Sequence, residues 1–225
     1  MGLNNDESLE GHRLINTKYP TIDLFEDVAS QDEFEALYEI QALTNPRLRA
    51  EVGCMDSISP DQFPYECTRG RSYAIAPFTH INPNGGRFND GLHGALYIAD
   101  EDHTAVMEVQ YHQQKYWSNI EGLEYDRFLF RGLIVKFSPE PIHIVKVTDA
   151  EILNPTSYAA SQQLARNLKE KNFQAIQYPS VRSKGNQCWA LLTPKPVKDI
   201  CQSYLIEMIW DGEKIAEVNR VQSAL

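Results

Sequence analysis

The sequence predicts an α+β domain built on a mixed or antiparallel sheet with flanking helices. Amphipathic spacing over 101–116 and 157–171 indicates two helices, while short runs rich in β-branched and aromatic residues indicate strands. Asp211-Gly212 lies between two such runs, and this dipeptide favours the positive backbone angles of a tight hairpin turn. Together these elements indicate the α+β class.

The N-terminal part of the chain is expected to hold one helix and little other regular structure. Residues 1–11 are polar and acidic, and we expect a flexible terminus there. Ser30 and Glu33 form a capping-box pattern that predicts a helix over 30–43. This helix ends before Pro46, because the residue before a proline disfavours the helical conformation. Residues 44–70 are predicted to be irregular.

The rest of the chain is expected to combine short strands with helices. We predict a strand over 72–78, a dense turn signal at 82–86 and a strand over 95–99. Asp100 is expected to cap the helix over 101–116. The remaining elements are a helix over 157–171, strands over 128–137, 142–147, 175–178 and 188–192, and a hairpin of 204–210 and 214–218.

The composition is that of an ordinary globular protein with a negative balance. The 225 residues are 42% hydrophobic and 23% charged, with a net charge of −10. That charge argues against sequence-independent binding of DNA or RNA, which requires a lysine and arginine surface. No apolar run approaches the roughly 18 residues of a membrane span, and the N-terminus lacks the features of a secretion signal. We therefore expect a cytoplasmic protein with no membrane partner.

The cysteines and histidines do not form a recognisable metal motif. The four cysteines are scattered, and without a CxxC pair they are expected to be free thiols in a reducing compartment. Several histidines near the centre of the chain lack the spacing that puts two ligands on one helical face. They are His80, His93, His103 and His112. We expect no metal site.

One segment combines residue types that suit a binding site. Two glycines at 85–86 permit a sharp turn and a close approach by a ligand, and Arg87 follows directly. Tyr97 lies at the end of the strand predicted over 95–99, and eleven residues later Glu108 lies in the middle of a predicted helix. Each feature alone is common in loops, cores and solvated helices, so the combination rather than any one residue suggests a site.

The order of these residues resembles the signature of the RES family. The central block is Gly-Gly-Arg-Phe-Asn-Asp-Gly at 85–91, then Leu-Tyr-Ile-Ala at 96–99, then Ala105 to Val109 with Glu108. A second block, Tyr-Pro-Ser-Val-Arg at 178–182, is similar to the late Pro-Ser strand of the family. A third block at 12–20 looks like the first-strand arginine of longer members, so the resemblance runs from about residue 12 to about residue 195.

The resemblance implies an ADP-ribosyltransferase-like fold and NAD⁺ as the substrate, without a metal. It implies one RES-type domain over 12–225 with a helical insertion at about 20–70. The expected activity is that of a toxin of the RES–Xre type II toxin–antitoxin systems, which cleaves the nicotinamide–ribose bond by phosphorolysis or hydrolysis. Inorganic phosphate would be the co-substrate of phosphorolysis, and an Xre-like antitoxin would be the partner. A protein ADP-ribosyltransferase and a catalytically inactive partner-binding module are the alternatives.

The resemblance also assigns roles to individual residues. Arginine forks suit phosphate oxygens, so Arg13 and Arg87 are expected to bind the diphosphate, with Lys18 in a supporting role. Tyr97 is expected to stack on the nicotinamide, and Glu108 to stabilise the positive charge that develops on the ribose. Ser180 is expected to bond the ribose or a phosphate.

The first arginine remains open at this level. Leu14 follows Arg13, whereas some short members have a tyrosine there. The long insertion before the central block leaves Arg69 or Arg71 as alternatives to Arg13.

Overall fold

A computed structural model describes residues 8–19 and 57–221. The helix predicted over 30–43 and Cys54 lie outside these ranges. Strand β1 (Leu9–Asn16) begins inside the segment 1–11, so the expectation of a flexible terminus is wrong for its last residues. Between 57 and 70 the chain forms only the short 3₁₀ helix η2 (Pro60–Gln62) and turns, as predicted for this part.

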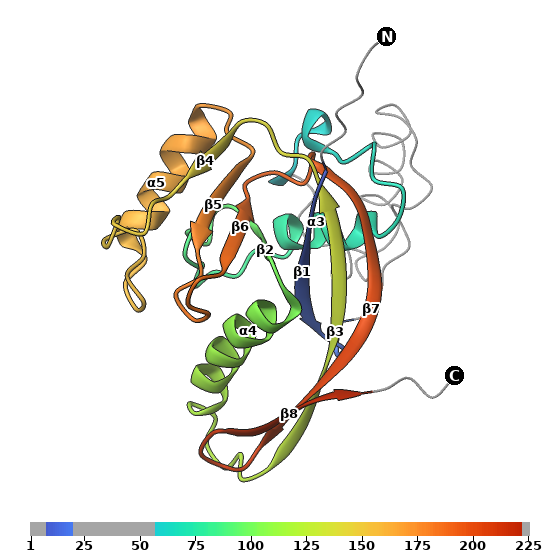
Figure 1. Ribbon diagram of the computed structural model, residues 1–225, viewed down its shortest axis with the longest axis vertical. Helices are drawn as coiled ribbons and strands as arrows, with labels where there is room; N and C mark the ends of the chain where they lie inside the picture. Colours follow the sequence, from blue (N-terminus) through green and yellow to red (C-terminus); the bar gives the residue numbers. More distant parts are fainter. Residues whose placement is uncertain (1–7, 20–56, 222–225) are drawn as a thin grey trace.

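An eight-stranded sheet organises the described chain, in the order β4-β5-β6-β2-β1-β3-β7-β8 (Figure 1). Neighbouring strands are antiparallel except β4 and β5, which are parallel. The mixed sheet confirms the predicted α+β class. Its remaining strands are β2 (Leu96–Ala99), β3 (Asp126–Phe137), β4 (Ile142–Ile144), β5 (Ala175–Pro179), β6 (Gln187–Leu191), β7 (Val197–Trp210) and β8 (Ile215–Val221).

Two of the predicted helices are present and one predicted strand is wrong. Helices α4 (Asp102–Trp117) and α5 (Ala159–Glu170) lie close to their expected positions. The segment expected as a strand over 72–78 is instead helix α3 (Arg71–Thr79). Most of its residues are buried, so it lacks the polar face that would give a helical period. Pro77 lies inside this helix, where it cannot donate a backbone hydrogen bond to the carbonyl of Tyr73.

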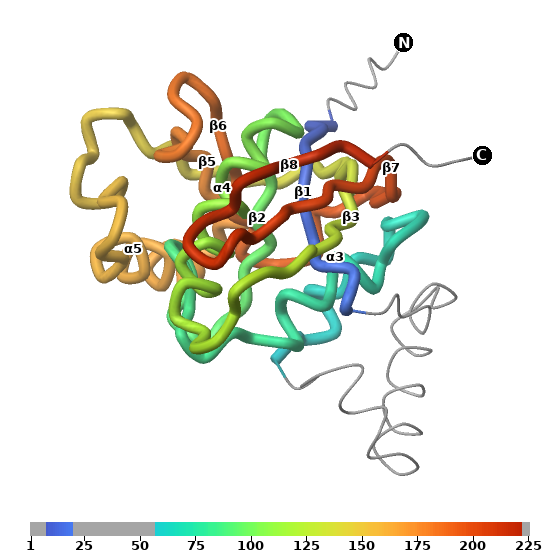
Figure 2. The backbone as a smooth tube through the Cα atoms, turned by 90° about the horizontal axis from the view of Figure 1, so that it is seen from below, coloured from blue at the N-terminus to red at the C-terminus, as the bar shows by residue number. Residues whose placement is uncertain are grey.

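The sheet has a hydrophobic core on each face. Because successive strand residues point to opposite faces, Leu96 and Ile98 of β2 join one core and Ala99 joins the other. The first core is covered by α3. The second is covered by α4 and α5, through side chains such as Trp117 and Leu168. Figures 1 and 2 show α5 beside β4 to β6 at one end of the sheet and β7 at the other.

The sheet is nearly divided between β1 and β2. These strands pair at His12 and Ala99 alone, whereas β1 pairs with β3 along all eight of its residues. The two strands therefore diverge beyond this pair. Residues of both strands face the gap that this divergence leaves, and the cavity described below lies there.

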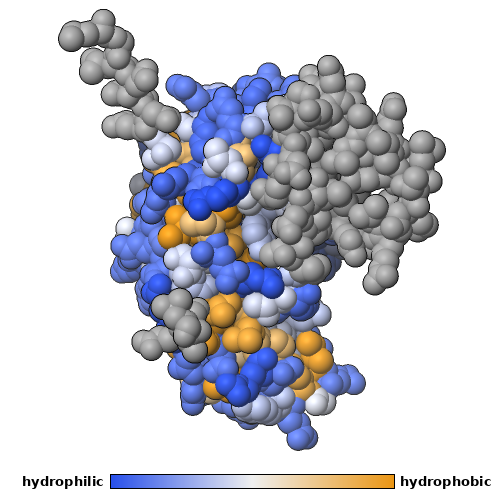
Figure 3. All heavy atoms as spheres, turned by 90° about the vertical axis from the view of Figure 1, so that its right-hand side faces the viewer, coloured by the Kyte–Doolittle hydropathy of each residue, from blue (hydrophilic) through white to orange (hydrophobic). Residues whose placement is uncertain are grey.

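The C-terminal hairpin of β7 and β8 is present at the predicted Asp211-Gly212 turn, but β7 extends well before 204. The ring of Tyr204 lies over Gly132 on β3, where a Cβ atom would be 2.1 Å from the ring. The guanidinium carbon of Arg220 lies 4.6 Å from the centroid of the Tyr204 ring, and Arg220 pairs with Asp102 of α4 at 3.0 Å. Seen from the β7 side, apolar patches lie among polar ones (Figure 3).

None of the described helices is long and apolar enough to cross a membrane.

Candidate active site

A cavity of about 860 Å³ opens where β1 and β2 diverge. Its walls come from β1, α3, the loop at 86–87, β2 and α4, so segments distant in the sequence meet around it. The volume lies within the roughly 300–1,000 Å³ typical of small-molecule sites. Four residues predicted from the sequence line this cavity: Arg13, Arg87, Tyr97 and Glu108.

Arg13 projects from β1 into the gap between the diverging strands. Its Nη1 donates a hydrogen bond to the carbonyl oxygen of Tyr97 at 3.0 Å, so a side chain joins the strands where their backbones no longer pair. Desolvation lowers the pKa of Arg13 to about 10, against an opposing effect of Tyr97, and the group stays protonated at neutral pH. A partly buried guanidinium binds an anion more strongly than an exposed one, because water screens it less.

The glycine turn presents Arg87 at its tip. The amide of Gly86 donates to the carbonyl of Asn89 at 2.8 Å, and Gly85 has φ of 66°, a conformation that glycine adopts without strain. Arg87 is buried, and its Nη1 donates to the carbonyls of Ile152 and Asn154 at 2.9 and 2.8 Å. The guanidinium has five N–H donors, so the fork retains donors for a ligand.

Tyr97 holds the glycine turn from the cavity side. Its hydroxyl accepts a hydrogen bond from the Phe88 amide at 2.8 Å and donates one to Asn89 Oδ1 at 2.7 Å. Burial raises the pKa of Tyr97, so the hydroxyl stays protonated at neutral pH. The ring lines the cavity, but its polar end is committed to the turn that carries Arg87. Tyr97 therefore shapes the site as well as facing it.

Glu108 faces the cavity from the middle of α4. With Ala105, Val109 and His112 it forms the helix face that lines the cavity, at the i, i+3, i+4 spacing of neighbours on one helix face. Its Oε1 accepts a hydrogen bond from the hydroxyl of Ser180 at 2.6 Å. This short bond fixes the carboxylate at the wall.

Ser180 lies behind Glu108 and does not line the cavity. Its Oγ accepts hydrogen bonds from the amides of Ser183 and Arg182 at 2.9 and 3.2 Å. A hydroxyl has two acceptor lone pairs and one proton, so these amides leave the proton for Glu108. The Ser180 hydroxyl is therefore bonded to the carboxylate in this structure, and its expected contact with ribose or phosphate stays a prediction.

The other predicted cations lie elsewhere. Lys18 is exposed, lies 5.0 Å from the ring of Tyr19 and does not line the cavity. Arg69 makes a two-pronged ion pair with Asp199, at 2.9 and 2.6 Å. Arg71 is buried and donates to the carbonyls of Tyr65 and Cys67. Of the three arginines left open by the sequence, Arg13 alone lines the cavity.

Sequence reasoning missed His112 and Tyr158, which also line the cavity. His112 lies one helical turn after Glu108, and that spacing was the available signal. Desolvation, followed by repulsion from Arg182 and Arg87, lowers the pKa of His112 to about 4, so its imidazole is neutral at physiological pH. Tyr158 lies under the Arg87 guanidinium, 4.8 Å from carbon to ring centroid, and no motif marked it.

The described residues contain no group of three or more histidine, cysteine or acidic side chains arranged to hold a metal ion. The cavity instead combines two arginines, one oriented carboxylate and several aromatic rings. This arrangement suits an organic ligand that carries anionic groups and a site of developing positive charge.

Comparison with known proteins gives a family match over the central and C-terminal parts of the chain. A family model described as RES domain matches residues 63–211. The chain is also 38% identical over 97 residues to the uncharacterized protein y4oC of Sinorhizobium fredii. That alignment covers 43% of this chain and 40% of the relative, so it spans well under half of either protein.

Proposed function

The chain belongs to the RES domain family, and from that premise we propose that it cleaves the nicotinamide–ribose bond of NAD⁺. The observation that carries the proposal is the Glu108 carboxylate, which Ser180 orients toward a cavity that Arg13 and Arg87 also line. The expected outcome is degradation of NAD⁺ by phosphorolysis or hydrolysis.

The arginines account for substrate binding in this proposal. NAD⁺ has a diphosphate, and guanidinium groups bind phosphate oxygens through charge-assisted hydrogen bonds. Arg13 and Arg87 approach the cavity from β1 and from the glycine turn respectively, so a diphosphate between them would contact both sides of the divergence. Lys18 lies outside the cavity and has no role in this proposal.

Glu108 accounts for the chemistry. The bond between the ribose carbon and the nicotinamide nitrogen breaks, and its electron pair leaves with nicotinamide, which becomes neutral. Positive charge develops on the ribose, as in glycoside cleavage, and a fixed carboxylate next to it lowers the barrier. A phosphate oxygen then forms the new bond and gives ADP-ribose phosphate, or water does so and gives ADP-ribose and a proton.

The test is NAD⁺ consumption by purified protein, measured with and without inorganic phosphate. Glu108→Gln keeps the size of the side chain and removes its charge, so we expect a loss of about 3 kcal/mol of barrier stabilisation, or roughly a hundredfold in rate. Glu170→Gln, at an exposed position on α5, is the matched control and should retain activity. Turnover by Glu108→Gln at the wild-type rate would contradict the role of Glu108.

The same assay separates the acceptors. A requirement for phosphate indicates phosphorolysis, and loss of NAD⁺ without phosphate indicates hydrolysis. If NAD⁺ is consumed only when a protein acceptor is added, and the adenylate label appears on that protein, the enzyme is an ADP-ribosyltransferase. Failure of the wild-type protein to consume NAD⁺ under all three conditions would overturn the proposal and favour a partner-binding module.

We also propose a toxin role with an Xre-like antitoxin as partner, which rests on family membership. Co-expression with the adjacent gene tests it: the expected result is a stable complex that lacks NAD⁺ turnover. A neighbouring product that leaves the activity and the elution volume of this protein unchanged would count against the pairing.

A further inference from the structure

Helix α5 contacts the turn that carries Arg87 through residues that do not line the cavity. All of α5 is described, and none of its residues lines the cavity. Yet the carboxamide of Gln162 donates to the carbonyls of Gly86 and Asn89 at 3.0 and 3.2 Å. These two carbonyls flank Arg87 in the sequence, so one α5 side chain holds both ends of the segment that presents the guanidinium.

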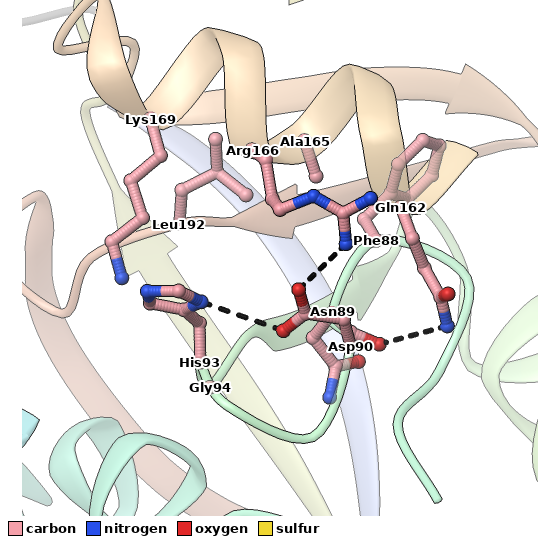
Figure 4. Close-up of a pocket in the computed structure, with 10 residues that line it drawn as sticks. All are labelled: Phe88, Asn89, Asp90, His93, Gly94, Gln162, Ala165, Arg166, Lys169 and Leu192. Atoms are coloured by element: carbon pink, nitrogen blue, oxygen red, sulfur yellow. Dashed lines mark hydrogen bonds and ion pairs between the residues drawn. The ribbon is translucent and has the colours of Figure 1, made fainter. Parts of the chain in front are cut away.

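A second contact holds the end of the same turn. Arg166, one helical turn after Gln162, donates from Nη1 to Asp90 Oδ2 at 2.7 Å. Asp90 Oδ1 also accepts from the amide of Leu92 at 3.1 Å and lies 3.4 Å from Nδ1 of His93. Figure 4 shows Arg166, Gln162 and His93 converging on the turn.

The surroundings of Asp90 favour its ionised form. Burial would raise its pKa, but the hydrogen bonds from Arg166, from the Leu92 amide and from His93 outweigh burial and lower the pKa to about 2. Asp90 is therefore ionised throughout the neutral range. Its side chain is 12% exposed and that of Arg166 is 40% exposed, so the pair lies at the edge of solvent.

The small space beside this cluster is too small for a substrate. Its volume is about 10 Å³, so this space has room for about one water molecule. The contacts instead connect α5 to the backbone around Arg87.

We infer that Gln162 and the Asp90–Arg166 pair are positioning residues for substrate binding by Arg87. Tyr97 fixes the turn from the cavity side, while Gln162 and Arg166 fix it from the α5 side. Held from both sides, Arg87 needs little further ordering when a diphosphate binds. The inference rests on the proposed function, because Arg87 binds the diphosphate of NAD⁺ in that proposal.

The effect is expected mainly on KM. Gln162→Leu preserves the approximate size of the side chain and removes both hydrogen bonds to the turn. Without these bonds the turn is less well ordered before the substrate binds, so we expect KM for NAD⁺ to rise by roughly tenfold, with kcat within about twofold. Glu170→Leu is the control, because Glu170 is an exposed residue at the end of the same helix. Arg166→Lys, which keeps the positive charge, should raise KM for NAD⁺ less than Arg166→Met does.

A double-mutant cycle separates positioning from a general structural effect. If Gln162 acts through Arg87, adding Gln162→Leu to Arg87→Ala changes kcat/KM by less than about twofold. The unfolding midpoint of each variant establishes that it is folded. If the wild-type protein consumes NAD⁺ but the two substitutions reduce kcat/KM independently, so that their fold-losses multiply, the inference is overturned and the proposed function is not. Absence of NAD⁺ turnover in the wild-type protein would overturn the proposed function, and the inference with it.

Discussion

Replacement of Ser180 by alanine tests how Glu108 is held. The change removes the 2.6 Å hydrogen bond to the carboxylate and also deprives the Ser183 and Arg182 amides of their acceptor. A hydrogen bond to a charged group contributes about 1.5–3 kcal/mol, which corresponds to a loss of roughly 10- to 150-fold. Because Ser180 lies behind Glu108 and outside the cavity wall, we expect this loss in kcat.

The assay is steady-state NAD⁺ consumption, with kcat and KM determined separately. Ser183→Ala is the matched control: Ser183 is buried in the same turn, and its backbone amide survives the change. We expect Ser183→Ala to keep kcat within about threefold of wild type. A tenfold rise in KM for Ser180→Ala with kcat unchanged would refute the reasoning, because it would mean that Ser180 contacts the substrate directly.

Three further predictions concern stability and protonation. Gly132→Ala places a Cβ atom against the Tyr204 ring, so we expect a loss of about 1–3 kcal/mol in the free energy of unfolding by urea, and an unchanged midpoint would contradict this packing. The folded-state pKa of Asp90 is depressed, so its contribution to stability is present above about pH 4 and is lost as the pH falls toward 2. The difference in unfolding free energy between wild type and Asp90→Asn should therefore shrink over that range, and a constant difference would argue against the ion pair. The folded-state pKa of His112 is also depressed, so the unfolded chain takes up its proton first and the fold loses stability as the pH falls from about 6.5 to about 4. An NMR titration should show His112 neutral above that lower value, and a midpoint near 6.5 would contradict the cavity environment.

The sequence was sufficient for elements whose local signals agree with their surroundings. The helices α4 and α5 and the terminal hairpin have clear periodicity or turn chemistry, and all are present. Helix α3 was missed because burial on most sides removes the helical period and because Pro77 argues against a helix. Asp100 was expected as a helix cap, but its carboxylate accepts from the Gln187 amide at 2.6 Å and Glu101 is the N-cap residue. This partner is 87 residues away, and no local pattern reveals it.

The candidate site was predictable to a similar degree. The motif order identified the cavity residues Arg87, Tyr97 and Glu108, and it gave Arg13 as one of three candidate arginines, although their roles remain proposals. The motif order did not reveal that the Ser180 hydroxyl is bonded to Glu108, because a sequence gives the order of residues but not which face of a turn they occupy. It also gave no weight to Gln162, whose partners are backbone carbonyls on a distant turn.

The near-division of the sheet has a mechanical consequence. Where β1 and β2 separate, the bond from Arg13 to the Tyr97 carbonyl takes the place of a backbone ladder, so this side chain joins the two strands beyond the His12–Ala99 pair. An anion that binds the Arg13 guanidinium therefore binds at the contact between β1 and β2. Occupancy of the cavity would then be transmitted to the relative motion of the two halves, and hydrogen exchange at β1 and β2 would register a bound ligand even at amides that never touch it.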